Sequence, residues 1–330
     1  MVKIYKRYVM KAVTLLILLM SFAPDGVWGQ TRQLIPTSFE SQRFFATPLV
    51  GENGTLRLLV DTSGPSLPGM YVLSHQATSR LKLPTVQCNF YGTTLSLIEP
   101  FPSAPTLPVA KQTPCHSVAF VDSRIDTMSW DGELGASYLM DFVWTFDYPK
   151  KQLWHEPDSW KPSADMHAAP IGLVKNSRGE NAGGVPRITV VIYDQPIDVA
   201  LETGAPTFTI KLQGDTQPTY SGSSYLAKST IDQLLHDHPN CCSVLMGDHQ
   251  NRMIGIRKIK IAGWLIGPVW FAEVPDTNFS RNVPGLGQLV DKPIHGVAGP
   301  NIFDHFAMTL DYQTDYAWFG CASGCAVADK

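Results

Sequence analysis

One short passage occurs twice in this chain, and the repetition limits the folds that the chain can adopt. Residues 58–66 read LLVDTSGPS and residues 199–207 read VALETGAPT, so each copy is an apolar run that ends in a carboxylate, a threonine and small residues. The two carboxylates, Asp61 and Glu202, are 141 positions apart, which is about the length of one domain. This spacing indicates a duplicated half rather than a short solenoid repeat, and two matched carboxylates predict one shared site.

A second pair of passages supports the duplication. Residues 135–148 align without a gap on residues 299–312, and five of the fourteen aligned positions are identical. Gly132 and Gly296 match just upstream. Each half is therefore predicted to contain a hairpin, a carboxylate loop, a variable middle, a glycine turn, a short helix and a closing strand.

These passages resemble the pattern of the bilobal aspartic peptidases, the pepsin-like and retropepsin-like group. The resemblance is carried by DTSG at 61–64 with LG at 134–135, and by ETGA at 202–205 with VAG at 297–299. Members of this family place a hydrophobic-hydrophobic-Asp-Thr/Ser-Gly loop in each lobe, followed far downstream by hydrophobic-hydrophobic-Gly and a helix. The resemblance implies an all-β fold with a few short helices, in which two lobes form a double barrel with a cleft between them.

The predicted boundaries place the first lobe at residues 38–160 and the second lobe at residues 186–322. Residues 161–185 are the predicted connection between the lobes, because this stretch is rich in proline, glycine and asparagine. The chain contains 25 prolines and 26 glycines in many short turns, a composition that also favours an all-β architecture.

The resemblance implies that Asp61 and Glu202 form a catalytic pair that hydrolyses peptide bonds. Two carboxyls about 3 Å apart cannot both ionise cheaply, so one pKa is expected to fall, the other to rise, and the pair to hold one proton. A water between them then has a base on one side, and the substrate carbonyl has an acid on the other. Thr62, Thr203 and Gly204 are expected to support the two loops or to contact substrate.

Three positions depart from the family pattern. Glu202 stands where the family has aspartate, Ser63 where it has the glycine of the first triplet, and Glu133 where an apolar residue is usual. The glutamate shifts its carboxyl by on the order of 1 Å, and such a misplacement can cost about 100-fold in rate. The expected activity is that of a weak or altered aspartic-type endopeptidase. The alternative is a non-catalytic pepsin-like binding or inhibitor protein that reuses the cleft.

The expected partner is an extended peptide or protein, held by main-chain hydrogen bonds with alternate side chains in opposite pockets. In the resembling family a mobile hairpin carrying a tyrosine folds over the cleft, so Tyr91 is a candidate for that flap; the alternative is a tyrosine at the edge of the core. The formal net charge of −3, without a basic block, argues against nucleic acid as a partner. We expect a monomer without a cofactor.

The N-terminus has the features of a signal peptide. Four basic residues among the first eleven precede an apolar run at residues 12–23, and small residues lie near position 29. The run of about 12 residues is short for a membrane span. Removal of residues 1–29 is expected to leave a secreted or periplasmic protein without a membrane attachment; the alternative is an uncleaved anchor.

Six cysteines in an exported chain favour disulfide bonds. Cys88 and Cys115 flank the variable middle of the first half and form the first predicted pair. Cys321 and Cys325 could close a small loop or reach back to the adjacent cysteines at 241–242. The cysteines do not follow a Cys-x-x-Cys pattern, and no suitably spaced histidine pair accompanies them, so we expect no metal site.

Overall fold

The fold is taken from a computed structural model of the chain. The structure describes residues 31–50, 54–98, 107–110, 113–210, 220–246 and 252–328. The predicted signal peptide, residues 1–29, lies outside these ranges. Among the described residues, no helix is both long enough and apolar enough to cross a membrane. Residues 32–330 form one unit, and the description below concerns that unit.

The first half of the chain builds one large sheet. In the described part of the chain this sheet has eight strands, which run in the spatial order β2 (Thr37–Glu40), β3 (Arg43–Ala46), β4 (Leu58–Val60), β9 (Gly132–Leu134), β5 (Tyr71–Leu73), β8 (Ala119–Val121), β7 (Thr93–Ile98) and β6 (Thr85–Phe90). The strands β4, β5 and β9 are buried along their whole length. The apolar residues of β4 and β5 suit the middle of the sheet, where neighbouring strands satisfy the backbone groups on both sides.

The second half builds a corresponding sheet. Its ten described strands run in the order β18 (Cys242–Met246), β19 (Arg252–Ile256), β22 (Val269–Val274), β17 (Ser224–Ala227), β23 (Gly296–Ala298), β14 (Gln195–Leu201), β13 (Arg187–Ile192), β20 (Ile259–Ile261), β21 (Trp264–Ile266) and β26 (Ala326–Val327). A separate two-stranded ribbon joins β15 (Phe208–Ile210) to β16 (Tyr220–Gly222).

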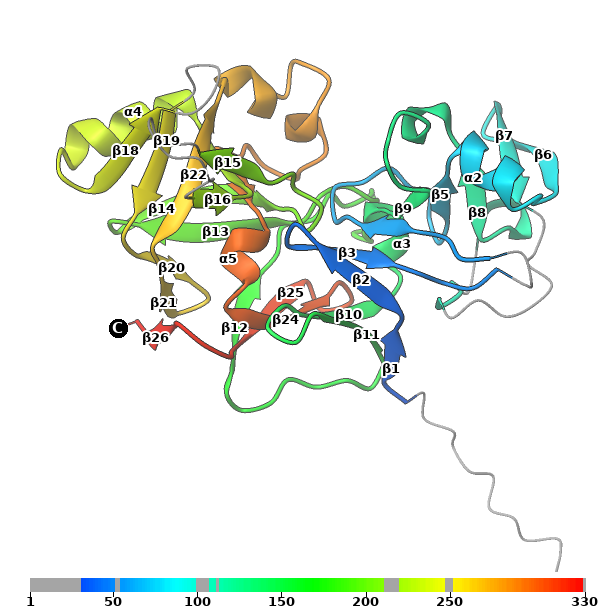
Figure 1. Cartoon of the computed structure of the whole chain (residues 1–330), viewed down its shortest axis with the longest axis horizontal. Helices are drawn as coiled ribbons and strands as arrows, with labels where there is room; N and C mark the ends of the chain where they lie inside the picture. The colour runs from blue at the N-terminus through cyan, green and yellow to red at the C-terminus, as the bar shows by residue number, and fades with distance from the viewer. Residues whose placement is uncertain are drawn as a thin grey trace, which may run out of the picture. The chain divides into compact units, whose positions relative to one another are not determined.

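A third sheet combines strands from both halves. Its order is β1 (Gln33–Ile35), β11 (Gln152–Glu156), β10 (Val143–Asp147), β24 (Phe306–Asp311), β25 (Tyr316–Cys321) and β12 (Met166–Pro170). Figure 1 shows β10 and β24 together in this sheet, where they pair antiparallel. The strand β12 belongs to the segment 161–185 that the sequence marked as a connection, and it pairs with β25 over its full length.

The two large sheets share a central motif. In the first half β4 pairs parallel with β9, β9 antiparallel with β5, and β5 parallel with β8. In the second half β14 pairs parallel with β23, β23 antiparallel with β17, and β17 parallel with β22. The order and directions are the same in both halves. The duplication predicted from the sequence is therefore present in the fold, and the all-β, bilobal class is confirmed.

The second repeated passage also forms the predicted elements in both halves. Each glycine turn leads into a short helix, α3 (Ala136–Leu139) or α5 (Pro300–Phe303), and then into the closing strand β10 or β24. Thr145 and Thr309, identical positions of the repeat, face each other directly across the β10–β24 pair. Their hydroxyl oxygens are 2.7 Å apart and buried. This contact of equivalent residues marks the pseudo-two-fold axis.

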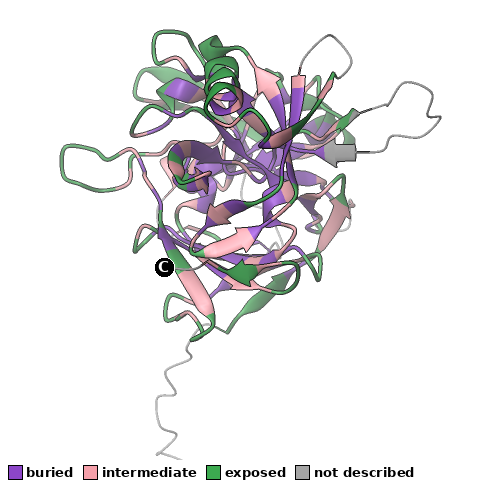
Figure 2. Ribbon diagram, turned by 90° about the vertical axis from the view of Figure 1, so that its left-hand side faces the viewer, coloured by how far each residue is buried: buried purple, intermediate pink, exposed green. Residues whose placement is uncertain are grey.

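The described residues also form helices outside the repeated passages. They are α2 (His75–Arg80), α4 (Lys228–Asp237) and the short 3-10 turns η1 (Pro114–His116), η2 (Ser123–Ile125), η4 (Asp276–Phe279) and η5 (Leu286–Gln288). Helix α4 buries Ile231 and Leu234, which are three residues apart and so share one face. Figure 2 shows that buried residues concentrate in the strands, with exposed residues in the outer loops.

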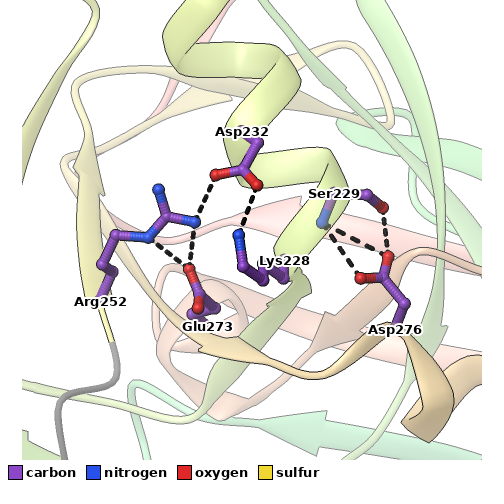
Figure 3. A network of polar contacts seen from close by, with 6 residues as sticks. All are labelled: Lys228, Ser229, Asp232, Arg252, Glu273 and Asp276. Carbon is purple, nitrogen blue, oxygen red and sulfur yellow. Dashed lines mark hydrogen bonds and ion pairs between the residues drawn. The ribbon is translucent and has the colours of Figure 1, made fainter.

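Polar contacts fix helix α4 to the strands beneath it (Figure 3). Arg252 on β19 donates to Asp232 on the helix at 2.5 Å, and its Nε donates to Glu273 on β22 at 2.5 Å. Lys228 also pairs with Asp232, at 2.6 Å. These groups lie at the surface, so each pair adds little stability by itself, and the network sets the position of the helix.

Three disulfide bonds are present. Cys88 is joined to Cys115, as the sequence predicted, and this bond ties the β6–β7 hairpin to η1. Of the two possibilities for Cys321, the structure has the short loop closed with Cys325. Cys241 and Cys242 are bonded to each other as neighbours in the chain.

The buried threonine pair on the axis gives a test of the fold. Replacing Thr145 by valine leaves the Thr309 hydroxyl buried without its partner, and we expect unfolding to become easier by about 1–3 kcal/mol. The double change Thr145→Val with Thr309→Val removes both polar groups and should cost less than the sum of the single changes. Urea unfolding of the four proteins measures the difference. Strictly additive costs would contradict a direct contact between the two hydroxyls.

Candidate active site

The two carboxylate loops begin in the same way. Asp61 follows the end of β4, and its N–H donates to the carbonyl of Leu134 on the neighbouring strand β9 at 3.0 Å. Glu202 follows the end of β14, and its N–H donates to the carbonyl of Ala298 on β23 at 3.0 Å. The parallel pairing of β4 with β9, and of β14 with β23, therefore delivers each carboxylate to the end of a buried strand pair.

Two threonines lock the loops to each other. The N–H of Thr62 donates to Oγ1 of Thr203 at 3.1 Å, and the N–H of Thr203 donates to Oγ1 of Thr62 at 3.1 Å. Each hydroxyl in turn donates to the carbonyl of the residue just before the opposite carboxylate, Leu201 at 2.6 Å and Val60 at 2.8 Å. Both threonines are fully buried. The loops of the two halves are thus held face to face by four hydrogen bonds.

Gly204 brings the second loop against the first carboxylate. A Cβ atom placed on Gly204 would lie 2.3 Å from the carboxyl carbon of Asp61, closer than any side chain can approach. Only glycine fits at this position because the backbone itself contacts the carboxyl. The equivalent position in the first loop is Ser63, which therefore faces Glu202 from the other side of the axis.

Ser63 donates two hydrogen bonds to the carboxyl of Asp61. Its N–H and its hydroxyl donate to Oδ1 of Asp61 at 2.8 Å and 2.9 Å. Ser63 also opposes the rise that burial produces in the pKa of Glu202. The two donors of Ser63 stabilise the charged form of Asp61, so the single proton of the pair is expected on Glu202. The geometry fits a neutral Glu202 beside an ionised Asp61.

The electrostatics of the pair agree with this assignment. Burial raises the pKa of Asp61, while hydrogen bonds from Ser63 and from the Gly64 backbone oppose the rise. Burial also raises the pKa of Glu202, to about 8, with a further contribution from the charge of Asp61. The fall of one pKa that the sequence predicted is therefore wrong, because burial acts on both groups. Asp61 still ionises first, since it receives more hydrogen bonds in its charged form.

A third buried carboxyl lies next to the pair. Glu133, in the middle of β9, is 4 % exposed. An atom added at Gly64 would touch Oε2 of Glu133 at 2.8 Å and Cβ of Asp61 at 3.1 Å, so one glycine separates the two acids. Burial raises the pKa of Glu133 to about 7, and the charge of Asp61 adds to the rise. The sequence identified Glu133 as a departure from the family pattern but not as part of the site.

Two further groups approach the carboxyls and were not identified from the sequence. Arg43 on β3 acts electrostatically on Asp61, and its guanidinium lies 5.5 Å from the ring centre of Trp130. Burial raises the pKa of Tyr225 to about 12, and the charge of Glu202 contributes. Tyr225 donates to the carbonyl of Pro206 at 2.6 Å. Arg43 could not be found by motif, because it reaches the site from a strand outside both repeats.

Two pockets flank the carboxylate pair. One, of about 470 Å³, is lined by Ser63, Gly64 and Glu133 and by residues from both halves of the chain. The other, also of about 470 Å³, is lined by Glu202, Tyr225 and Val297 together with apolar residues of the second half. A peptide with one bond at the carboxylates would therefore have a pocket for a side chain on each side of that bond.

Tyr91, the candidate flap residue, lies at the turn of the β6–β7 hairpin. It is 94 % exposed, and its ring packs against Phe90 with 4.6 Å between ring centres. This exposure rules out the alternative position at the edge of the core. The structure does not place Tyr91 against the carboxylates, whereas it brings Asp61, Thr62, Thr203 and Gly204 together with Glu202.

Comparisons with known proteins found similarity at the level of structure. No protein-family model matches the sequence, and no curated protein matches it. The structure is similar to an aspartic proteinase from Irpex lacteus, with 13 % identity, a TM-score of 0.47, and coverage of 89 % of this chain and 98 % of that one. It is also similar to basic 7S globulin from soybean, with 10 % identity, a TM-score of 0.45, and coverage of 89 % and 95 %.

The third carboxyl makes stability depend on pH. The pKa of Glu133 is about 7 in the folded protein against 4.5 for the ordinary group. Its neutral form therefore favours the fold fully below pH 4.5, and that contribution is lost as the pH rises through 7. Glu133→Gln should match the unmodified protein at pH 4 and exceed its free energy of unfolding at pH 8 by about 3 kcal/mol. Urea unfolding at both pH values tests this, and a difference independent of pH would contradict it.

Proposed function

We propose that the chain is an exported aspartic-type endopeptidase in which Asp61 and Glu202 activate a water against a peptide bond. The observation that carries the proposal is the apposition of the two loops, since reciprocal hydrogen bonds between Thr62 and Thr203 hold both carboxylates at one buried site. Such a pair with one proton can act as base and acid in the same step.

The proton assignment sets the order of events. Asp61, ionised, takes a proton from the water as its oxygen attacks the substrate carbonyl carbon. Glu202, protonated, gives its proton to the carbonyl oxygen, and a neutral tetrahedral diol forms. The diol then collapses: Asp61 returns its proton to the amide nitrogen, the carbon–nitrogen bond breaks, and Glu202 takes back a hydroxyl proton. The products are a carboxylic acid and an amine, and the pair regains its starting protonation.

Ser63 and Glu202 are proposed to be a matched pair of departures. The serine occupies the position equivalent to Gly204, where the second loop tolerates no side chain at all. Glutamate reaches one methylene further than aspartate, so its carboxyl can lie beside Ser63 without the backbone contact that Gly204 makes. The hydrogen bonds of Ser63 to Asp61 favour the proton on Glu202, and the longer side chain of Glu202 holds its carboxyl away from the position that an aspartate would give it. Slow hydrolysis is the expected consequence.

The proposed substrate is an extended peptide. The pockets on either side of the carboxylates fit alternate side chains of such a chain. The three disulfide bonds suit an oxidising compartment. We propose secretion or transport to the periplasm after loss of residues 1–29, function as a monomer, and a flap role for Tyr91 at its hairpin turn.

Changing Glu202 and Ser63 to the residues of the family pattern tests the mechanism. Glu202→Asp retracts the carboxyl and Ser63→Gly opens the room that it needs, so the double variant should cleave peptides on the order of 100-fold faster than the unmodified protein. Each single change should gain less, because the two side chains occupy the same space. Peptide cleavage followed by mass spectrometry gives kcat/KM for the four proteins.

Asp61→Asn is the control for the chemistry. It removes the base with little change of shape and should abolish cleavage in both the unmodified protein and the double variant. Cleavage that survives this change would move the chemistry to other residues. If the unmodified protein and the double variant both fail to cleave but bind peptides, the alternative of a binding protein replaces the proposed hydrolysis.

The pH profile gives an independent test. The reacting form carries its proton on Glu202, whose pKa burial raises to about 8, so this form persists into neutral solution and is lost above about pH 8. Activity measured as kcat/KM should therefore be retained at pH 7 and fall tenfold per pH unit well above 8. A profile that already falls between pH 5 and 6 would show that the Glu202 proton is not the one required.

A further inference from the structure

The pocket next to the first carboxylate loop has an unusual lining. It has a volume of about 470 Å³, and Ser63 and Gly64 of the loop form part of its wall. Val185 and Leu289 close it from the second half of the chain. Glu133 also lines it, so the pocket has a carboxyl that only Gly64 separates from Asp61.

The pocket on the other side of the axis has an apolar residue at the position equivalent to Glu133. Glu133 is the middle residue of β9 (Gly132–Leu134), and the equivalent residue of β23 (Gly296–Ala298) is Val297. Val297 lines the pocket beside Glu202, where Phe279 and Leu286 are further apolar walls. The two pockets therefore stand at equivalent places in the duplicated fold, and a single position gives one an apolar wall and the other an acid.

Few hydrogen-bond donors or cations offset the charge that Glu133 carries when it is ionised. Among the described residues Glu133 receives one hydrogen bond, from the Trp130 indole to Oε1 at 3.1 Å. The cation that lines the same pocket, Arg124, donates from Nε and Nη2 to Asp122 at 2.9 Å and 2.5 Å. Its charge is thus largely balanced by Asp122. Asp61 on the opposite side repels a charge on Glu133, which no cation contacts directly among the described residues.

We infer that this pocket binds a lysine or arginine side chain of the peptide, with its cationic group against the Glu133 carboxyl. The inference rests on the proposed function, since it assigns one pocket of the same cleft to a substrate side chain. A bound ammonium or guanidinium would supply the missing hydrogen-bond donors and offset the repulsion between Glu133 and Asp61. The equivalent pocket with Val297 should prefer an apolar side chain.

The test compares lysine with norleucine, which has the same carbon chain without the ammonium group. Two pairs of peptides place these residues at one or the other position next to the bond that meets the carboxylates. Binding is measured by calorimetry with the Asp61→Asn protein at pH 8, so that no cleavage occurs and the result does not depend on catalysis. We expect lysine to bind on the order of tenfold more tightly at one position only, with norleucine preferred at the other.

Variants at position 133 test whether Glu133 causes the lysine preference. Glu133→Val installs the residue that the chain itself uses in the other pocket, and it should reverse the preference to norleucine. Glu133→Gln keeps the shape and removes the charge, and it should make lysine and norleucine bind about equally or favour norleucine. Glu273→Gln removes a carboxylate from the surface network of Figure 3, outside both pockets, and should keep the lysine preference.

The pH dependence adds a second readout. Glu133 faces Asp61 and Arg124, and burial raises its pKa to about 7, so lowering the pH to 5 should reduce the lysine preference of the Asp61→Asn protein. Equal binding of lysine and norleucine at both positions, absence of binding by either peptide, or a lysine preference retained in Glu133→Val would each overturn the inference. A lysine preference in Asp61→Asn, together with no peptide cleavage by the unmodified protein or by the double variant Glu202→Asp with Ser63→Gly, would overturn the proposed hydrolysis alone.

Discussion

The reciprocal hydrogen bonds between Thr62 and Thr203 are the contact on which the site depends. Each threonine binds the backbone of the other loop, and each hydroxyl also binds the residue that precedes the opposite carboxylate. The positions of the two loops are therefore set by backbone contacts, in a place from which water is excluded. Substitution of the carboxylate itself changes the reach of a side chain but leaves this frame in place. That separation explains how the fold can persist while the chemistry changes.

The sequence was sufficient for the parts of the fold that repeat. The passages around Asp61 and Glu202 predicted the two loops, and the passages that begin at Gly135 and Gly299 predicted the short helices and the closing strands. These features are local, so neighbouring residues specify them. The sequence also predicted the pairing of Cys88 with Cys115, because both flank one segment of the first half.

Other features depend on contacts between residues far apart in the chain, and the sequence did not reveal them. The sheet that joins both halves takes β1 and β12 from segments without a repeat. The guanidinium of Arg43, which acts electrostatically on Asp61, lies near the ring of Trp130 from a distant segment. The pKa values of Asp61 and Glu202 both rise, although the sequence predicted that one of them would fall. The rise follows from burial, which a sequence motif does not encode.

At the site, the two halves of the duplicated fold carry different residues at equivalent positions. Ser63 stands opposite Gly204, Asp61 opposite Glu202, and Glu133 corresponds to Val297. A symmetric site would give two equal carboxyls and two equal pockets, and such a site could not decide which acid holds the proton. Here the hydrogen bonds at Ser63 stabilise the charge on Asp61. Burial raises the pKa of both Glu202 and Glu133, and the repulsion from the charge of Asp61 adds to each rise. The charge on Asp61 therefore links the proton of the pair to the acid in the pocket, and a cation bound at Glu133 would act on both.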